Sequence, residues 1–272
     1  MTAEAGARPG AGPGPAGAVH ADLFEDGTVL RLVLDRPKGN VLTAVMMRAL
    51  ADALDAHAAR PALRLVFLRG AGGTFSWGAS VEEHRADAAP AMLATLHDLA
   101  RRLAAYPVPV AALVEGRCLG GAFELALCCH FVFAARDAVF ACPEVKLGVF
   151  PPVLATLGPQ RLGAALAERL LLTGETMGAE ALTGCGFVTA LLDGDPEAGL
   201  LAWYRAGLRG LSAFALRQGI AAIRGDTAAL AALREPLAAA ERRYVREVLT
   251  SHDGTEGIEA FLARRPPVWG DR

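Results

Sequence analysis

Long apolar runs are missing from this sequence of 272 residues: no stretch reaches the roughly 18 uninterrupted apolar residues of a membrane-spanning helix. No two cysteines have C-x-x-C spacing, and no cysteine–histidine spacing is typical of a zinc site. An excess of basic residues is missing too, because the formal net charge is −2 and the isoelectric point is about 6.3. We therefore expect no membrane, nucleic acid or metal among the partners of the chain.

The first 18 residues are rich in glycine, proline and alanine and lack the apolar segment of a secretory signal. Arginine and hydroxyl-bearing residues are too few there for a transit peptide, so we predict a disordered tail over residues 1–18. The five cysteines, apart from Cys185, lie in apolar stretches, which is typical of reduced thiols buried in a core. This pattern indicates a cytoplasmic location.

Apolar residues are abundant: they make up 53% of the chain, with a mean hydropathy of +0.32, enough for a large core and for buried contacts between subunits. Apolar patterns predict strands at 28–37, 63–70, 108–116, 130–135, 138–144 and 186–192. Helical spacing predicts helices at 43–59, with Thr43 as N-cap, at 91–106, and in most of the chain after about residue 160. Strands that alternate with helices indicate an α/β fold with crossover connections over residues 19–197, followed by a separate helical layer over residues 198–272.

One carboxylate stands out in the stretch CLGGAFELALCC, residues 118–129, where every other residue is small or apolar. A predicted strand runs into the Gly-Gly pair, and a helix is predicted to start at Gly120 or Gly121. The first amides of a helix have no partner within it and carry the positive end of its dipole. Glycine also lets a ligand approach the backbone closely, so the Gly121 amide is a candidate oxyanion donor, with Glu124 one turn further along.

Two further turns complete a candidate constellation. The turn GGTFSWGASVEEH, residues 72–84, follows a predicted strand and offers the Ala79 amide as a second donor to the same oxygen. Two converging amides suit a thioester carbonyl that becomes an enolate. In the turn CPEVKLGVF, residues 142–150, Glu144 lies among apolar residues. Two glutamates whose environments shift their pKa values apart could position one water molecule and deprotonate it.

Taken together, these turns resemble signatures of the crotonase (enoyl-CoA hydratase/isomerase) superfamily over roughly residues 20–265. The family patterns are F-x-x-G-A-D, G-x-x-x-G-G-x-x-E and P-E-x-x-x-G. The corresponding residues are FSWGAS at 75–80, GRCLGGAFE at 116–124 and PEVKLG at 143–148. The tail SHDGTEGIEAFLARRPPVW, residues 251–269, resembles the closing segment of the family.

The resemblance implies an α/β spiral of β-β-α units of the ClpP/crotonase type, with a C-terminal helical region that forms a homotrimer or a dimer of trimers. It implies that Ala79 and Gly121 donate to an acyl-CoA carbonyl, and that Glu124 and Glu144 handle water, with Glu144 delivering the α-proton. No cofactor is implied beyond the coenzyme A of the substrate. The substrate-binding residues carried over are Lys38, Gly39, Val41, Ser76, Trp77, Gly78, Ser80, Val81, Gly120 and Phe150.

Departures from the family pattern bear on the substrate. Ser80 replaces the usual aspartate, and the glycine-rich turn after Gly148 is replaced by an apolar one. The combination F-S-x-G-A-S-V-E-E-H with L-G-V-F-x-P resembles cyclic-dienoyl-CoA hydratases, which add water 1,4 across cyclohexa-1,5-diene-1-carbonyl-CoA. A flat alicyclic ring would suit a pocket lined by Trp77, Phe150 and Val153.

Other functions compete with hydration. The first is an isomerase of the same superfamily that moves a double bond with one glutamate, and the second is a non-catalytic protein that binds coenzyme A or another protein. A third is a serine hydrolase on the related fold that uses Ser76 or Ser80, although no histidine and aspartate pattern supports it. His84 is either a base in the pocket or a cap of the helix after its loop.

Overall fold

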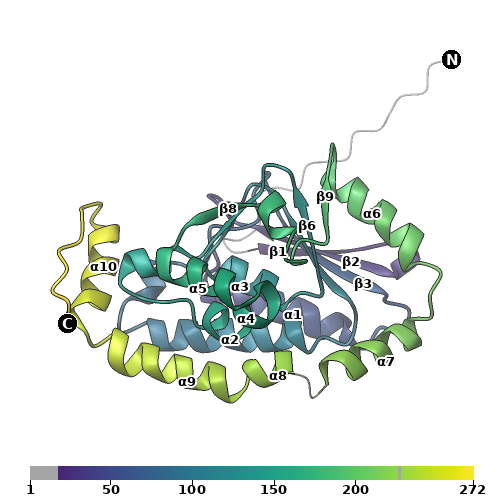
Figure 1. Ribbon diagram of the computed structural model, residues 1–272. Helices are drawn as coiled ribbons and strands as arrows, with labels where there is room; N and C mark the ends of the chain where they lie inside the picture. Colours follow the sequence, from purple (N-terminus) through teal and green to yellow (C-terminus); the bar gives the residue numbers. More distant parts are fainter. Residues whose placement is uncertain (1–17, 226–227) are drawn as a thin grey trace.

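The computed structural model describes residues 18–225 and 228–272 (Figure 1). The predicted tail, residues 1–18, falls outside these ranges except for Ala18, which begins the first strand. In the described residues, no helix combines the length and the apolar character needed to cross a membrane.

A six-stranded sheet with the order β1-β2-β3-β4-β6-β9 forms the centre of the chain. Among the pairs of this sheet that the structure describes, β1–β2 is antiparallel and the other four are parallel. The strands are β1 (Ala18–Phe24), β2 (Val29–Asp35), β3 (Leu65–Gly70), β4 (Val110–Val114), β6 (Phe131–Ala135) and β9 (Ala190–Leu192). A second, three-stranded sheet consists of β5 (Arg117–Leu119), β7 (Val139–Ala141) and β8 (Thr176–Gly178). The predicted strands are confirmed, whereas β1, β5 and β8 were not predicted.

The helices follow the apolar periodicity of the sequence, and the predicted helices at 43–59 and 91–106 are confirmed with slightly different ends. Thr43 caps α1 as predicted, because its side chain accepts a hydrogen bond from the amide of Met46. The longer helices are α1 (Ala44–Ala58), α2 (Ala89–Ala104), α3 (Gly121–Cys128), α4 (Pro152–Leu162), α5 (Ala164–Thr173), α6 (Pro196–Gly207), α7 (Ala213–Arg224), α9 (Glu235–Arg243) and α10 (His252–Leu262). Shorter helical turns are η1 (Glu25–Gly27), η2 (Glu82–His84), η3 (Pro143–Leu147), η4 (Ala179–Leu182), α8 (Ala228–Ala232) and the π-helical η5 (Tyr244–Val248).

The central sheet has helices on both faces, as expected for parallel strands. Alternate residues of β2, such as Leu30 and Leu32, point into the larger core, with α1, α2 and α3. Phe67 and Phe133 point to the opposite face, where Tyr204 of α6 packs against them. The domain boundary expected at residue 198 therefore falls inside α6, a helix that packs on one face of the sheet. The later helices α8 and α9 run beside α2 (Figure 1).

Three aromatic rings, Phe123, Phe140 and Phe187, pack edge to face in the core at centroid distances of 5.3, 5.5 and 5.8 Å. We expect Phe187→Ala to lower the free energy of unfolding by about 3–5 kcal/mol, because it removes a buried ring and leaves a cavity. Denaturant unfolding followed by circular dichroism measures the loss. Leu172→Ala, at a side chain that is 68% exposed, should change the same quantity by less than about 0.5 kcal/mol. Equal effects of the two substitutions would contradict this account of the core.

Candidate active site

Extended segments from distant parts of the chain lie side by side at one end of the small sheet. Strands β5 and β7 are parallel, with Leu119 paired to Ala141, so the residues that follow them leave the sheet at the same end. Single β-bridges pair Ser76 with Cys118 and Leu42 with Ala79. The loop at 76–79 therefore lies beside strand β5. The predicted turns near residues 79, 121 and 144 therefore meet in space.

The amides of Ala79 and Gly121 are neighbours in this arrangement. A Cβ atom placed on Gly121 would lie 3.5 Å from the Ala79 nitrogen and 3.4 Å from its Cβ. Neither amide finds an acceptor within the described part of the chain. Gly78, just before Ala79, has φ +94°, and a Cβ there would lie 2.6 Å from the Leu119 carbonyl oxygen, so this approach of the loops requires glycine. Two free amides are thus available to one ligand atom.

Glu124, in the first turn of α3, is only 2% exposed. Its Oε1 accepts hydrogen bonds from the amides of Val153 at 2.6 Å and Leu154 at 3.0 Å. These amides begin α4, whose first residue is Pro152, so they are the first free N–H groups of that helix. Burial raises the pKa of Glu124, and the two amides, together with the positive potential of His97, oppose this rise. The end of α4 thereby favours the ionised form of Glu124.

Glu144 has the opposite environment, although its side chain is also buried, with 9% exposure. Burial, and then the negative charge of Glu124, raise the pKa of Glu144 to about 8. Its Oε2 has no hydrogen-bond partner in the described residues. A Cβ on Gly120 would lie 2.6 Å from Oε1 of Glu144, so glycine lets this carboxyl group lie against the backbone. Of the two, Glu124 has the surroundings that favour the carboxylate, and Glu144 has the surroundings that favour the carboxylic acid.

A cavity of about 60 Å³ lies between the loops and Glu144. It is lined by Trp77, Gly78, Ala79, Val81, His84, Gly120, Pro143, Glu144 and Leu147. Of the residues predicted to bind substrate, it therefore contains Trp77, Gly78, Val81 and Gly120. His84 is also a lining residue, but its Nδ1 lies 2.7 Å from the Ser80 carbonyl oxygen and burial lowers its pKa, so the imidazole is neutral.

Other predicted substrate-binding residues shape the surroundings of this cavity. Ser76 is fully buried, and its hydroxyl donates to the Asn40 carbonyl and accepts from the Gly78 amide. The Ser80 hydroxyl donates to the Glu82 carboxylate at 2.8 Å. Both hydroxyls bond to neighbouring loop groups rather than to a histidine, so the geometry gives no support to a serine hydrolase.

The loop with Lys38, Gly39 and Val41 packs beside the turn of Trp77, whose amide donates to the Gly39 carbonyl at 2.8 Å. Phe150 lies elsewhere: it lines a separate cavity of about 370 Å³ with Trp269 and packs against Tyr244. The structure therefore does not bring Phe150 into the cavity beside Glu144.

Sequence reasoning missed two buried polar residues that interact electrostatically with the glutamates. His97 on α2 is fully buried; its Nδ1 lies 2.6 Å from Oε2 of Glu241, and its Nε2 has no partner among the described residues. The Tyr244 hydroxyl is buried without a partner in the same set of residues. The one local signal was His97 itself, a polar residue among the buried positions of an amphipathic helix.

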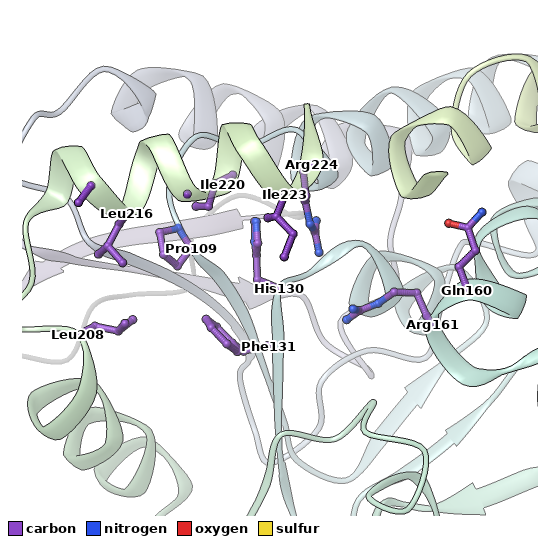
Figure 2. Close-up of a pocket in the computed structure, with 12 residues that line it drawn as sticks. Pro109, His130, Phe131, Gln160, Arg161, Leu208, Leu216, Ile220, Ile223 and Arg224 are labelled. Carbon is purple, nitrogen blue, oxygen red and sulfur yellow. The ribbon is translucent and has the colours of Figure 1, made fainter. Parts of the chain in front are cut away.

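A cavity of about 620 Å³, larger than the one beside Glu144, has a separate lining (Figure 2). Side chains of α7, among them Leu216, Ile220 and Ile223, face Pro109 and His130 across it. It contains arginines but no carboxylate and none of the predicted site residues. Size alone therefore does not identify the reacting centre.

The chain is similar to known proteins over most of its length. A family model described as enoyl-CoA hydratase/isomerase matches residues 25–272. The chain is 41% identical over 250 residues to the cyclohexa-1,5-dienecarbonyl-CoA hydratase of Thauera aromatica, covering 92% of this chain and 96% of the relative. It is 32% identical over 276 residues to the carnitinyl-CoA dehydratase of Salmonella typhi, covering 92% and 98%. The crystal structure of an enoyl-CoA hydratase from Mycobacterium avium subsp. paratuberculosis K-10 superposes with a TM-score of 0.81 at 29% identity, over 94% of this chain and 100% of that chain.

The raised pKa of Glu144 makes stability depend on pH. The unfolded chain loses this proton near pH 4.5 and the folded chain near pH 8, so the wild type loses stability as the pH rises between these values. A glutamine has no such ionisation. We expect ligand-free Glu144→Gln to melt at a higher temperature than wild type at pH 8, and the difference to disappear towards pH 4.5.

Thermal unfolding across this pH range tests the expectation. Glu168→Gln, at an exposed residue of α5, is the matched control and should follow the wild-type curve. A difference between Glu144→Gln and wild type that does not change with pH would contradict the assigned pKa.

Proposed function

We propose that this chain, which belongs to the enoyl-CoA hydratase/isomerase family and is an enoyl-CoA hydratase-type enzyme, adds water to an alicyclic dienoyl-CoA thioester. The predicted α/β crotonase fold is confirmed by the same matches. The main support for the proposal is a pair of buried glutamates beside two free amides. The surroundings of one glutamate favour the carboxylate, and those of the other favour the carboxylic acid. The reaction needs no cofactor beyond the coenzyme A of the substrate.

In the proposed reaction the thioester oxygen accepts hydrogen bonds from Ala79 and Gly121. Charge moves onto this oxygen as the enolate forms, and donors fixed in advance stabilise it. Ionised Glu124 takes a proton from water while the hydroxyl oxygen bonds to the β-carbon or its vinylogous equivalent. Protonated Glu144 then gives a proton to carbon: to the α-carbon of a simple enoyl ester, or to the γ-carbon at the far end of the dienolate in the 1,4 addition to the cyclic diene. The proton held by Glu124 must reach Glu144 before the next turnover, which restores both groups.

The acyl group is inferred from two observations. The relative with 41% identity is named a cyclohexa-1,5-dienecarbonyl-CoA hydratase, and the aromatic residue Trp77 is among those that line the cavity beside Glu144. An isomerase requires one group that moves a proton between carbons. The presence of two carboxyl groups with opposite preferred charge states favours the addition of water instead.

Assembly is part of the proposal. Three apolar side chains are exposed on or next to α7: Leu211 is 47%, Phe214 70% and Ile223 67% exposed. The cavity of about 620 Å³ opens between this helix and the sheet (Figure 2). Exposed apolar surface of this kind marks an interface. We infer that α7 packs against a second copy of the chain in a homotrimer or a dimer of trimers, and that the protein acts in the cytoplasm, where buried thiols such as Cys118 stay reduced.

Both glutamates should be essential for turnover. We expect Glu124→Gln and Glu144→Gln each to lower the turnover of cyclohexa-1,5-diene-1-carbonyl-CoA by at least ~100-fold, the range for acid–base groups, while the affinity for the CoA ester survives. Product mass identifies the reaction: a gain of one water indicates hydration, an unchanged mass with a shifted double bond indicates isomerisation, and free coenzyme A indicates hydrolysis. Crotonyl-CoA, assayed in parallel, tests the preference for a ring.

The control for these variants is Glu168→Gln, which keeps the same chemistry at an exposed site and should retain wild-type turnover. Wild-type turnover in either glutamate variant would remove that residue from the mechanism.

A charge on α7 should break the assembly. We expect wild type to have the mass of three or six copies in light scattering, and Phe214→Glu with Ile223→Glu to reduce it, because an ionised side chain is not tolerated in an apolar interface. Leu172→Glu on α5, an equally exposed position, is the control and should keep the wild-type mass. A monomeric wild type would rule out the assembly.

A further inference from the structure

His84 and Glu144 are the two residues with titratable side chains that line the cavity of about 60 Å³. His84 lies on η2, shortly after the loop of Ala79, and its side chain is only 9% exposed. The other described residues of the lining are glycine, alanine, valine, proline, leucine and tryptophan, whose side chains offer no hydrogen-bond acceptor. Among these lining residues, His84 and Glu144 therefore supply the side-chain acceptors.

A hydrogen bond fixes which nitrogen of the His84 ring carries the proton. Nδ1 lies 2.7 Å from the Ser80 carbonyl oxygen, which accepts only, so Nδ1 is the donor. In the neutral imidazole the lone pair is then on Nε2. Nε2 makes no hydrogen bond within the described residues, and it is not among the polar atoms that are buried there without a partner. Nε2 is therefore a free acceptor with surface that a ligand can reach.

His84 touches two spaces, and they differ in size. The smaller, between η2 and α10, has a volume of about 20 Å³. Because one water needs at least about 10–15 Å³, this space has room for roughly one water. The other, of about 60 Å³, lies between the loop of Ala79, Gly120 and Glu144. Of the two, the cavity beside Glu144 is the one with room for a group of the substrate.

The chemistry of hydration leaves one O–H group that needs an acceptor. In the proposed reaction the water gives its first proton to Glu124, and the proton of Glu144 goes to carbon. The second O–H bond of the water stays intact and becomes the hydroxyl group of the product. In a buried site this donor costs free energy unless it finds an acceptor. His84 is the side chain of the cavity lining whose acceptor is left free for it.

We propose that neutral His84 is a third catalytic group, whose Nε2 accepts a hydrogen bond from the oxygen that is added to the substrate. This inference rests on the proposed hydration. The hydrogen bond orients the water, persists while its oxygen bonds to carbon, and then holds the hydroxyl group of the product. No proton moves onto His84, because the O–H bond that it orients stays intact.

The substitution His84→Asn tests the proposal, because the shorter amide can still donate to the Ser80 carbonyl but has no acceptor at the position of Nε2. We expect the kcat for cyclohexa-1,5-diene-1-carbonyl-CoA to fall at least ~10-fold, the loss of about one hydrogen bond in the transition state. In initial-rate inhibition, the inhibition constant of the hydroxylated product should rise about 10-fold. That of cyclohexanecarbonyl-CoA, which has the ring but no hydroxyl group, should stay within about 3-fold of wild type.

His57→Asn is the matched control. Nδ1 of His57 lies 2.8 Å from the carbonyl oxygen of Ala53, four residues earlier, which is the same local contact as that of His84 with Ser80. His57 is on α1 and lines neither of the two spaces that His84 touches. Its substitution should leave kcat and both inhibition constants at their wild-type values.

A second variant, His84→Phe, keeps a flat ring but has no nitrogen. It should raise the ratio of the two inhibition constants, product over hydroxyl-free ester, as His84→Asn does. Since the ratio compares two ligands on the same protein, any folded variant reports it, whatever its stability.

Each outcome decides the matter. A ratio that stays at the wild-type value in both variants overturns the assignment, because His84 would then serve only the shape of its loop. A kcat of His84→Asn within about 2-fold of wild type overturns it as well. If wild type itself shifts the double bond or releases coenzyme A from the dienoyl ester, the proposed hydration fails and the role of His84 fails with it. Hydration by wild type together with an unchanged ratio in the variants would remove His84 alone.

Discussion

The arrangement of the site depends on one electrostatic constraint: two glutamates are buried near each other, where the ionisation of both is energetically unfavourable. Burial raises the pKa of both carboxyl groups, and the negative charge of Glu124 raises that of Glu144 further. The two carboxyl groups differ in their hydrogen bonds. Glu124 accepts hydrogen bonds from two amides at the start of α4, whereas one oxygen of Glu144 has no hydrogen-bond partner in the described residues. One residue is thereby prepared to accept a proton and the other to donate one, before any substrate is bound.

Backbone features, rather than further charged residues, create this inequality. Pro151 and Pro152 have no N–H group, so the first amides that α4 can offer are those aimed at Glu124. The parallel pairing of β5 and β7 places the turns after both strands at one end, and Gly120 removes the side chain that would displace Glu144. The apolar turn at 148–154, a departure from the family pattern, is thus the segment that holds Glu124.

Local patterns in the sequence were sufficient to predict five of the six strands of the central sheet, all but β1, as well as the cap at Thr43 and the turns that meet at the site. They were insufficient for β5 and β8, which have three residues each and are too short to show alternation. The position of Phe150 could not be inferred because an apolar residue in a turn carries no signal of the cavity it enters. Tyr204 shows the same limit in the helical region: its contact with the sheet, which places α6 in the core, depends on tertiary packing alone.

The C-terminal helices are the part of the chain whose contribution to the site is hardest to infer from sequence, and the reason is geometrical. Helix α9 packs on α4, the helix that holds Glu124, and Glu241 near its end bonds to His97. The next turn puts Tyr244 against Phe150. These contacts join residues more than 90 positions apart, since the separation of Tyr244 from Phe150 is 94 residues and that of Glu241 from His97 is 144. A segment expected to serve only assembly therefore also packs on the helix whose first amides bind Glu124, so the packing of α9 acts through α4 on that glutamate.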